Sequence, residues 1–187
     1  MQHLLASPLR STSTNIDSHA KWIQNGVTVA GGNGQGSDTN QINQPFGLCV
    51  DDDETIYVAD CSNHRIVEWK CGATIGQIVA GGNKSGDGAH QLNSPTDVIF
   101  DKATDSFIIA DYGNKRVVRW PRQNGTNGKT IISNISCHGL TIDEKGSLYI
   151  VDHENHEVRR YSIDDTEGTV VAGGNGQGNQ PDQLLKP

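Results

Sequence analysis

The chain has little of what several large functional classes require. Its 187 residues carry 15 Lys and Arg against 22 Asp and Glu, which gives a net charge of −7. It therefore lacks the basic surplus with which a protein neutralises nucleic-acid phosphates. No apolar run approaches the roughly 20 residues that a membrane-spanning helix needs. These absences argue against a nucleic-acid partner and against a membrane span, and the acidity favours a soluble protein.

The four cysteines also lack a recognisable pattern. No Cys-x-x-Cys spacing occurs, which argues against a zinc ribbon. We expect no intrachain disulfide, because the strand order predicted below keeps the cysteines apart, while bridged Cα atoms must lie within about 7 Å. The cysteines are Cys49, Cys61, Cys71 and Cys137.

The N-terminal region shows neither a targeting signal nor a strand pattern. Met1–Asn15 has one basic residue and no continuous apolar core, so it does not predict a signal peptide. Residues 1–20 are predicted to be a disordered or poorly ordered tail. The compartment stays open, and an extracellular location remains an alternative if the N-terminus is incomplete.

An internal repeat dominates the rest of the chain. Val-Ala-Gly-Gly-Asn occurs three times, at Val29–Asn33, Val79–Asn83 and Val171–Asn175. An apolar run that ends in Asp also recurs, with 51 residues and then 41 residues between successive Asp positions. These spacings lie near the period of about 40–50 residues that is typical of propeller blades.

Each repeat contains four short runs of β-forming residues between Asp, Asn and Gly turns, and no amphipathic helix is apparent. The prediction is an all-β partial β-propeller with three four-stranded antiparallel blades at about 45–82, 95–133 and 137–174. A leading strand from an incomplete blade is expected at Val27–Ala30, after the end of a third strand at Lys21-Trp22. The propeller segment is expected to span residues 21–175, and residues 176–187 are expected to be the truncated start of a next repeat.

Asn63-His64-Arg65, preceded by Asp60 and followed by an aliphatic run, resembles the NHL repeat, which is named for an Asn-His-Leu signature. Asn114–Arg116 and Asn155–Glu157 resemble degenerate copies of the same signature, and the resemblance covers residues 27–175. It implies a propeller that usually has six blades. This chain is then expected to be part of a longer propeller, or a truncated gene product, with two uncovered apolar blade faces that promote self-association.

The recurring polar residues are predicted to be structural. Each Asp would accept hydrogen bonds from turn backbone groups and pair with the Arg across the turn, whereas a ring of acids near one mouth is the functional alternative. The predicted turn residues are Asp60, Asn63, His64, Arg65, Asp111, Asn114, Arg116, Asp152, Asn155 and His156.

Three residues at the starts of the first strands are expected to line the central channel: Phe46, Thr96 and His138. Channel histidines hold a metal ion in the peptide-amidating lyases that resemble NHL propellers, and only His138 matches them by position. Repeats one and two place Phe46 and Thr96 there, so no ring of histidines is expected. No metal site and no cofactor are therefore predicted. The glycine-rich loops complete no phosphate-binding motif.

The leading functional hypothesis is a scaffold that binds a protein or peptide. One alternative is a metal-dependent lyase or hydrolase that acts in the channel, although no catalytic constellation is visible. Another alternative follows from the resemblance, because NHL propellers serve as recognition parts of tripartite-motif ubiquitin ligases and as sensors of receptor kinases. No RING finger or kinase segment occurs in the chain.

Overall fold

Twelve β-strands make up most of the regular structure in the residues that the computed structural model describes, which are 19, 21, 24–162, 165 and 167–187. They form three four-stranded antiparallel sheets, each made of consecutive strands, as the sequence predicted. Blade 1 comprises β1 (Pro45–Val50), β2 (Ile56–Asp60), β3 (Arg65–Trp69) and β4 (Gln77–Gly81). Blade 2 comprises β5 (Pro95–Asp101), β6 (Ser106–Asp111), β7 (Arg116–Pro121) and β8 (Lys129–Ser133). Blade 3 comprises β9 (Cys137–Ile142), β10 (Leu148–Asp152), β11 (Glu157–Tyr161) and β12 (Thr169–Gly173).

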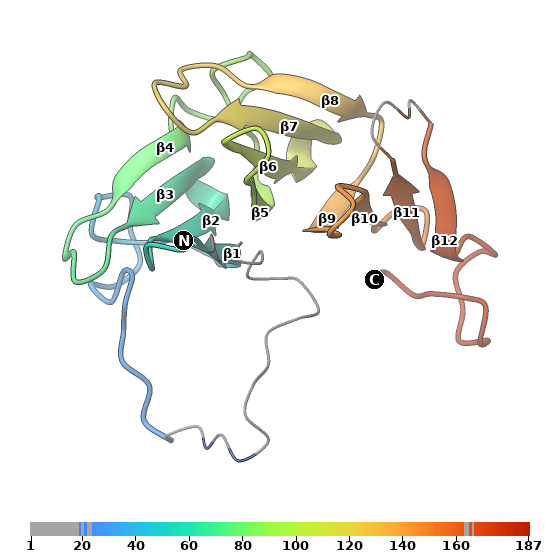
Figure 1. Cartoon of the computed structure of the whole chain (residues 1–187), viewed down its shortest axis with the longest axis horizontal. Helices are drawn as coiled ribbons and strands as arrows, with labels where there is room; N and C mark the ends of the chain where they lie inside the picture. Colours follow the sequence, from blue (N-terminus) through green and yellow to red (C-terminus); the bar gives the residue numbers. More distant parts are fainter. Residues whose placement is uncertain (1–18, 20, 22–23, 163–164, 166) are drawn as a thin grey trace, which may run out of the picture.

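The three blades stand side by side along an open arc (Figure 1). The first strands β1, β5 and β9 lie on its inner side, and the fourth strands β4, β8 and β12 lie on its outer side. β5 contacts both β1 and β9. The sheets therefore radiate from one centre, which is the arrangement of a β-propeller. None of the helical segments among the described residues is long and apolar enough to cross a membrane.

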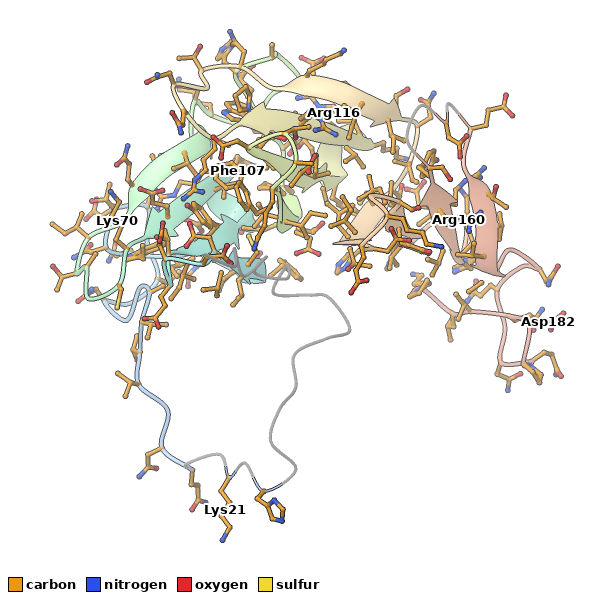
Figure 2. All side chains as sticks on the ribbon, viewed as in Figure 1. Lys21, Lys70, Phe107, Arg116, Arg160 and Asp182 are labelled. Carbon is orange, nitrogen blue, oxygen red and sulfur yellow. The ribbon has the colours of Figure 1, made fainter. Side chains whose placement is uncertain are left out.

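Apolar side chains on both faces of the central strands build the core between blades. Tyr57 and Ala59 of β2 share one cluster with Phe107 and Ile109 of β6, and all four are fully buried. The ring centroids of Tyr57 and Phe107, the latter labelled in Figure 2, lie 4.7 Å apart. Because blade 2 has a neighbour on each side, β6 is apolar at successive positions rather than at alternate ones.

A residue in the left-handed conformation ends the turn between the second and third strands of every blade. His64, Lys115 and His156 have φ angles of 54°, 50° and 56°. In blade 1 the backbone N–H of His64 donates to the carbonyl of Cys61 and closes the turn η1 (Cys61–Asn63). Residues with a Cβ adopt this conformation at a cost, so hydrogen bonds around the turn must hold it.

The expected leading strand at Val27–Ala30 is wrong, because these residues form no strand and Val27 is largely exposed. A fourth strand is held by hydrogen bonds to a third strand, and within the described residues no strand pairs with this segment. Lys21 lies outside any strand, and Trp22 lies outside the described residues. Of the predicted tail, residues 1–18 and 20 also lie outside them.

The two ends of the arc differ, although the sequence predicted that both would expose an apolar face. The outer face of blade 1, by which we mean the sheet face that points away from blade 2, is already covered. Its residues Val58, Val67 and Trp69 are at most 4 % exposed. Ala30 and Ile42 of the preceding segment pack against this cluster. Within the described part of the chain no segment covers blade 3 in this way, and the face of blade 3 that points away from blade 2 is described below.

Candidate binding site at the mouth of the arc

The Asp that ends β2 collects three hydrogen-bond donors. Asp60 is fully buried, and its Oδ1 accepts the backbone N–H of Asn43 at 2.7 Å. Its Oδ2 accepts the Nδ2–H of Asn63 at 2.8 Å and the Nε–H of Arg65 at 2.7 Å. Arg65 is only 4 % exposed, so Asp60 and Arg65 form a buried, charge-assisted pair.

Arg65 and Asn63 also hold the segment that precedes blade 1. Asn63 donates to the carbonyl of Gly36 at 2.8 Å. The two terminal nitrogens of Arg65 donate to three further carbonyls at 2.7–3.1 Å, those of Ser37, Asp38 and Gln41. We call the Asp, Asn and Arg of such a turn a clamp, and the segment that they hold a clamped loop.

Blade 2 repeats the clamp with Asp111, Asn114 and Arg116. Asp111 Oδ2 accepts from Asn114 at 2.8 Å and from Arg116 at 2.7 Å. Arg116, labelled in Figure 2, donates to carbonyls of the loop between blades 1 and 2, and Asn114 donates to another. The four carbonyls belong to Gly86, Asp87, Gly88 and Gln91.

Blade 3 departs from this pattern because it has no loop to clamp. Asp152 still accepts from Asn155 at 2.8 Å, but Glu157 stands in place of the clamp arginine. Only residues 134–136 connect β8 to β9, so the long glycine-rich loop is missing there. Arg159 instead pairs with Glu157 at 3.0 Å.

The histidines of the signature turns fasten one blade to the next loop. The backbone N–H of Ser94 donates to Nδ1 of His64 at 3.0 Å. Lys186 N–H donates to Nδ1 of His156 at the same distance. In both cases the imidazole of a left-handed residue accepts from the loop that follows its own blade.

Four rings meet at the inner end of the arc, on the side where the clamps lie. They come from all three blades: Phe46 is the second residue of β1, Tyr112 lies in the turn η2 (Tyr112–Asn114), and His138 and His153 belong to blade 3. The centroid of His138 lies 5.6 Å from Phe46, 6.0 Å from Tyr112 and 5.6 Å from His153. We call Phe46, Tyr112, His138 and His153 the mouth cluster.

The mouth cluster combines exposure with unused hydrogen-bonding capacity. Phe46 is 54 % exposed, and the other three residues are half-buried. The Nδ1 atom of His153 is buried without a hydrogen-bond partner in the part of the chain that the structure describes. Burial, and then the neighbouring imidazole of His153, lower the pKa of His138 below its usual range, which favours the neutral form of the His138 imidazole.

Of the three expected channel residues, Phe46 and His138 come together and Thr96 does not. Thr96 is 4 % exposed, and its hydroxyl donates to the carbonyl of Cys137 at 3.2 Å. The next residue, Asp97, accepts the backbone N–H of Leu140 at 2.9 Å. The start of β5 therefore joins blade 2 to blade 3 rather than facing the opening.

Sequence reasoning missed Tyr112 and His153 as members of this site. Each directly follows the Asp that ends a second strand, and Cys61 occupies the same place in blade 1. This repeated position could have predicted that Tyr112 and His153 belong to the site, because it lies beside the start of each first strand. Across the described residues, no three His, Cys, Asp or Glu side chains are grouped so as to hold a metal ion.

Comparison with known proteins supports the repeat and the fold. The family model for the NHL repeat matches residues 43–69 and 135–161. No curated protein matches the chain. A structural genomics protein of unknown function from Bacteroides thetaiotaomicron is similar with a TM-score of 0.62 and 19% identity, over 76% of this chain and 40% of that one. A chain of the nidogen/laminin complex is similar with a TM-score of 0.58 and 19% identity, over 70% of this chain and 49% of that one.

A virginiamycin B lyase from Staphylococcus aureus is similar with a TM-score of 0.51 and 12% identity, over 72% of this chain and 43% of that one. The chain thus spans less than half the length of each of these three structures. At such identities the likeness shows the fold alone. Together with the two matched repeats and the three blades, it shows that the chain contains NHL repeats and forms an open β-propeller arc.

Proposed function

We propose that the chain is a scaffold that binds a protein or peptide at the mouth cluster. The observation that carries this proposal is the meeting of four rings from three blades, with Phe46 more than half exposed. The rings are set on strands and tight turns that are anchored by a buried aspartate in each blade, namely Asp60, Asp111 and Asp152. A ligand side chain would therefore meet a surface that is already in place, which limits the entropy lost on binding.

The chemistry of the mouth cluster suits an apolar or aromatic side chain of a peptide. Exposed aromatic residues on rigid supports are typical anchors of protein interfaces. At the rim, Lys115 of blade 2 and Glu154 of blade 3 pair at 2.7 Å with both side chains more than half exposed. These charges offer polar contacts to the backbone or to the flanking residues of a peptide.

The neighbours in structure give limited further support. The nidogen/laminin complex shows that an arc of this kind occurs in a protein that is assembled with another protein. The lyases show that the same fold occurs in enzymes. We favour binding because His138 has one neighbouring imidazole, and a metal-dependent reaction would need more donors that converge on one point.

The test is selection of peptides from a random library displayed on phage, followed by calorimetry with the selected peptides. Phe46→Ala should weaken binding about tenfold or more, which corresponds to about 1.4 kcal/mol. Ile75→Ala is the matched control. Ile75 is also an exposed apolar residue of blade 1, but it lies in the β3–β4 connection at the opposite end of the strands.

Two results would count against the proposal. One is that no peptide is enriched over a protein-free surface. The other is that Phe46→Ala and Ile75→Ala change the affinity equally, which would place the binding surface elsewhere.

A further inference from the structure

The segment after blade 3 has the sequence and the shape of a clamped loop. Residues 172–178 are identical to residues 30–36, which begin the loop that the clamp of blade 1 holds. All three loops are closed by the same kind of isolated parallel bridge. The bridges join Gln35 to Ile42, Ser85 to Leu92, and Gln177 to Leu184.

In the part of the chain that the structure describes, no clamp holds this third loop. By sequence alignment, the carbonyls of Gly178, Asn179 and Gln183 correspond to those of Gly36, Ser37 and Gln41. In the first loop those carbonyls accept hydrogen bonds from Asn63 and Arg65. Among the described residues no side chain donates to the carbonyls of Gly178, Asn179 or Gln183, although the side chains of Asn175 and Gln183 donate to other carbonyls within the loop. It therefore presents a preformed set of acceptors for an Asn and an Arg.

The sheet face beside the third loop is incompletely covered. Tyr149, Val151 and Val158 are only half-buried. Their counterparts in blade 1, Tyr57, Ala59 and Ile66, are fully buried by blade 2. A blade that covered this face would have to bring both apolar cover and a clamp.

Blade 1 of a second copy of the chain offers both features. It carries a complete clamp, and the outer face beside that clamp is apolar, with Val58, Val67 and Trp69. Blade 2 presents the equivalent face, including Ile109, Val118 and Trp120, to blade 1. A contact between blade 3 of one copy and blade 1 of the other would thus repeat the contact that blade 1 already makes with blade 2 within one chain.

Residues 27–44 occupy this face of blade 1 within a single copy. As far as the structure describes the chain, their first residues lack the strand pairing that attaches the start of the third loop to blade 3. β12 pairs along its length with β11. Val27–Ala30, at the equivalent place, has no strand partner among the described residues, and Val29 is 60 % exposed. An exchange would keep the clamp hydrogen bonds, would leave the pairing of β12 with β11 intact and would add the apolar cover.

We propose that two copies of the chain join head to tail by exchanging these loops. Residues 169–186 of each copy displace residues 27–44 of the other and enter its Asp60–Asn63–Arg65 clamp. Figure 1 shows that blades 1 and 3 border the open side of the arc, and the rings of Phe46 and His138 meet across its inner side. This curvature lets the same joint form twice, so the two arcs close a ring with three blades from each copy.

The mass of the 187-residue chain is measured by sedimentation equilibrium over a range of concentrations. The proposal predicts a dimer of twice the 20.1 kDa of one chain, with no larger species. A monomer at all concentrations would overturn it, and so would an open-ended series of oligomers, because the ring would then not close.

Hydrogen exchange at low and high concentration tests the loop exchange itself. In the dimer, exchange in residues 174–186 should slow, and exchange in residues 27–44 should become faster. Protection of residues 174–186 without exposure of residues 27–44 would show that the copies associate without exchange, which contradicts the proposal.

Two substitutions test the joint from opposite directions. Val158→Asp places a charge on the uncovered face of blade 3 and should abolish the dimer. Val170→Asp is the matched control, because Val170 pairs with Arg159 and lies on the other face of the same blade. It should leave the dimer intact, and equal effects of the two changes would refute the joint.

A further substitution, Cys71→Arg, should strengthen the joint. Arg122 of blade 2 donates to Asp51 of blade 1 at 2.6 Å and lies over the ring of Tyr57. The counterparts at the new joint are Cys71 on blade 1, and Asp143 and Tyr149 on blade 3. Cys71→Arg should therefore tighten dimerisation about tenfold. Unchanged dimerisation would contradict the predicted register. The outcome is independent of the proposed function, since the mouth cluster takes no part in the joint.

Discussion

Phe46 of β1 and His138 of β9 meet edge to face with ring centroids 5.6 Å apart, although a whole blade separates their strands along the chain. The contact is made because three inner strands curve around one centre. It brings the first and third blades together at the surface that we propose for ligand binding. The stability of that surface depends on the clamps and turns that set the blades, and these can be tested separately.

Removing the clamp carboxylate should destabilise the fold strongly. Asp60→Ala would leave the buried Arg65 without its charge partner, and the amides of Asn43 and Asn63 without their acceptor. We expect a loss of about 3–5 kcal/mol in the free energy of unfolding, measured by urea denaturation.

The control for this change is a surface ion pair. Lys102 pairs with Asp52 at 2.8 Å, with 30 % and 50 % of the two side chains exposed. Lys102→Ala should therefore cost less than about 1 kcal/mol. If Asp60→Ala cost no more than Lys102→Ala, the clamp would not be a principal support of the blade.

Two glycines with the same backbone conformation should respond differently to alanine. Gly81 and Gly72 have φ angles of 68° and 75°, so alanine is strained at both places. A Cβ on Gly81 would also meet the carbonyl oxygen of His64, whereas a Cβ on Gly72 would meet nothing within 4 Å. Gly81→Ala should therefore cost about 1–3 kcal/mol more than Gly72→Ala in thermal or urea unfolding. Equal losses would show that the β4 end is not packed against the turn of blade 1.

Stability should depend on pH through His138. Its pKa is lowered in the folded chain by burial and by His153, while the unfolded chain titrates near about 6.5. The unfolded state therefore binds the proton first as the pH falls. The contribution of the neutral imidazole is fully present above about pH 6.5 and is lost as the pH falls through the window below that value.

Urea unfolding at several pH values between neutral and mildly acidic tests this expectation. His138→Asn should reduce the loss of stability on acidification, and His90→Asn, at an exposed position, should not. A pH dependence that is the same in the native chain and in His138→Asn would rule out this role of His138.

Thiol reactivity should separate one cysteine from the other three. None of the four cysteines, all of which lie in the described residues, forms a disulfide; Cys71 is exposed, and Cys49, Cys61 and Cys137 are buried. Burial also raises the pKa of Cys61 and raises that of Cys137 well above its usual range, which further slows their reaction. Native protein should show one fast thiol, which is lost in Cys71→Ser, and denatured unreduced protein should show four. Two thiols after denaturation would reveal a disulfide.

The repeat made the blades predictable. A pattern that places an apolar run, an Asp and an Asn-x-Arg in one order can be satisfied by few arrangements, and the Asp60 and Asp111 turns follow from it. The loss of the clamp arginine at Glu157 also has a cause in the sequence, namely the short connection before blade 3. The domain boundaries that the sequence suggests for the chain ends remain predictions.

What the sequence could not predict depends on contacts between distant segments. Val27–Ala30 has the residues of a strand, but a strand forms only where a partner lies alongside it. The cover that Ala30 and Ile42 give to blade 1 likewise depends on where the clamp draws the loop. The repeated position after Asp111 and Asp152 was a signal for Tyr112 and His153, but their contact at the mouth also depends on the curvature of the arc, which no local pattern encodes.

The most direct test of the account is to map the bound peptide by NMR. Backbone and side-chain resonances of the chain would be followed as a peptide selected on it is added. The account predicts that the largest shifts fall on Phe46, Tyr112, His138 and His153, with small changes along β4, β8 and β12. Shifts that are confined to the outer strands, or to the connections at the far end of the blades, would contradict it.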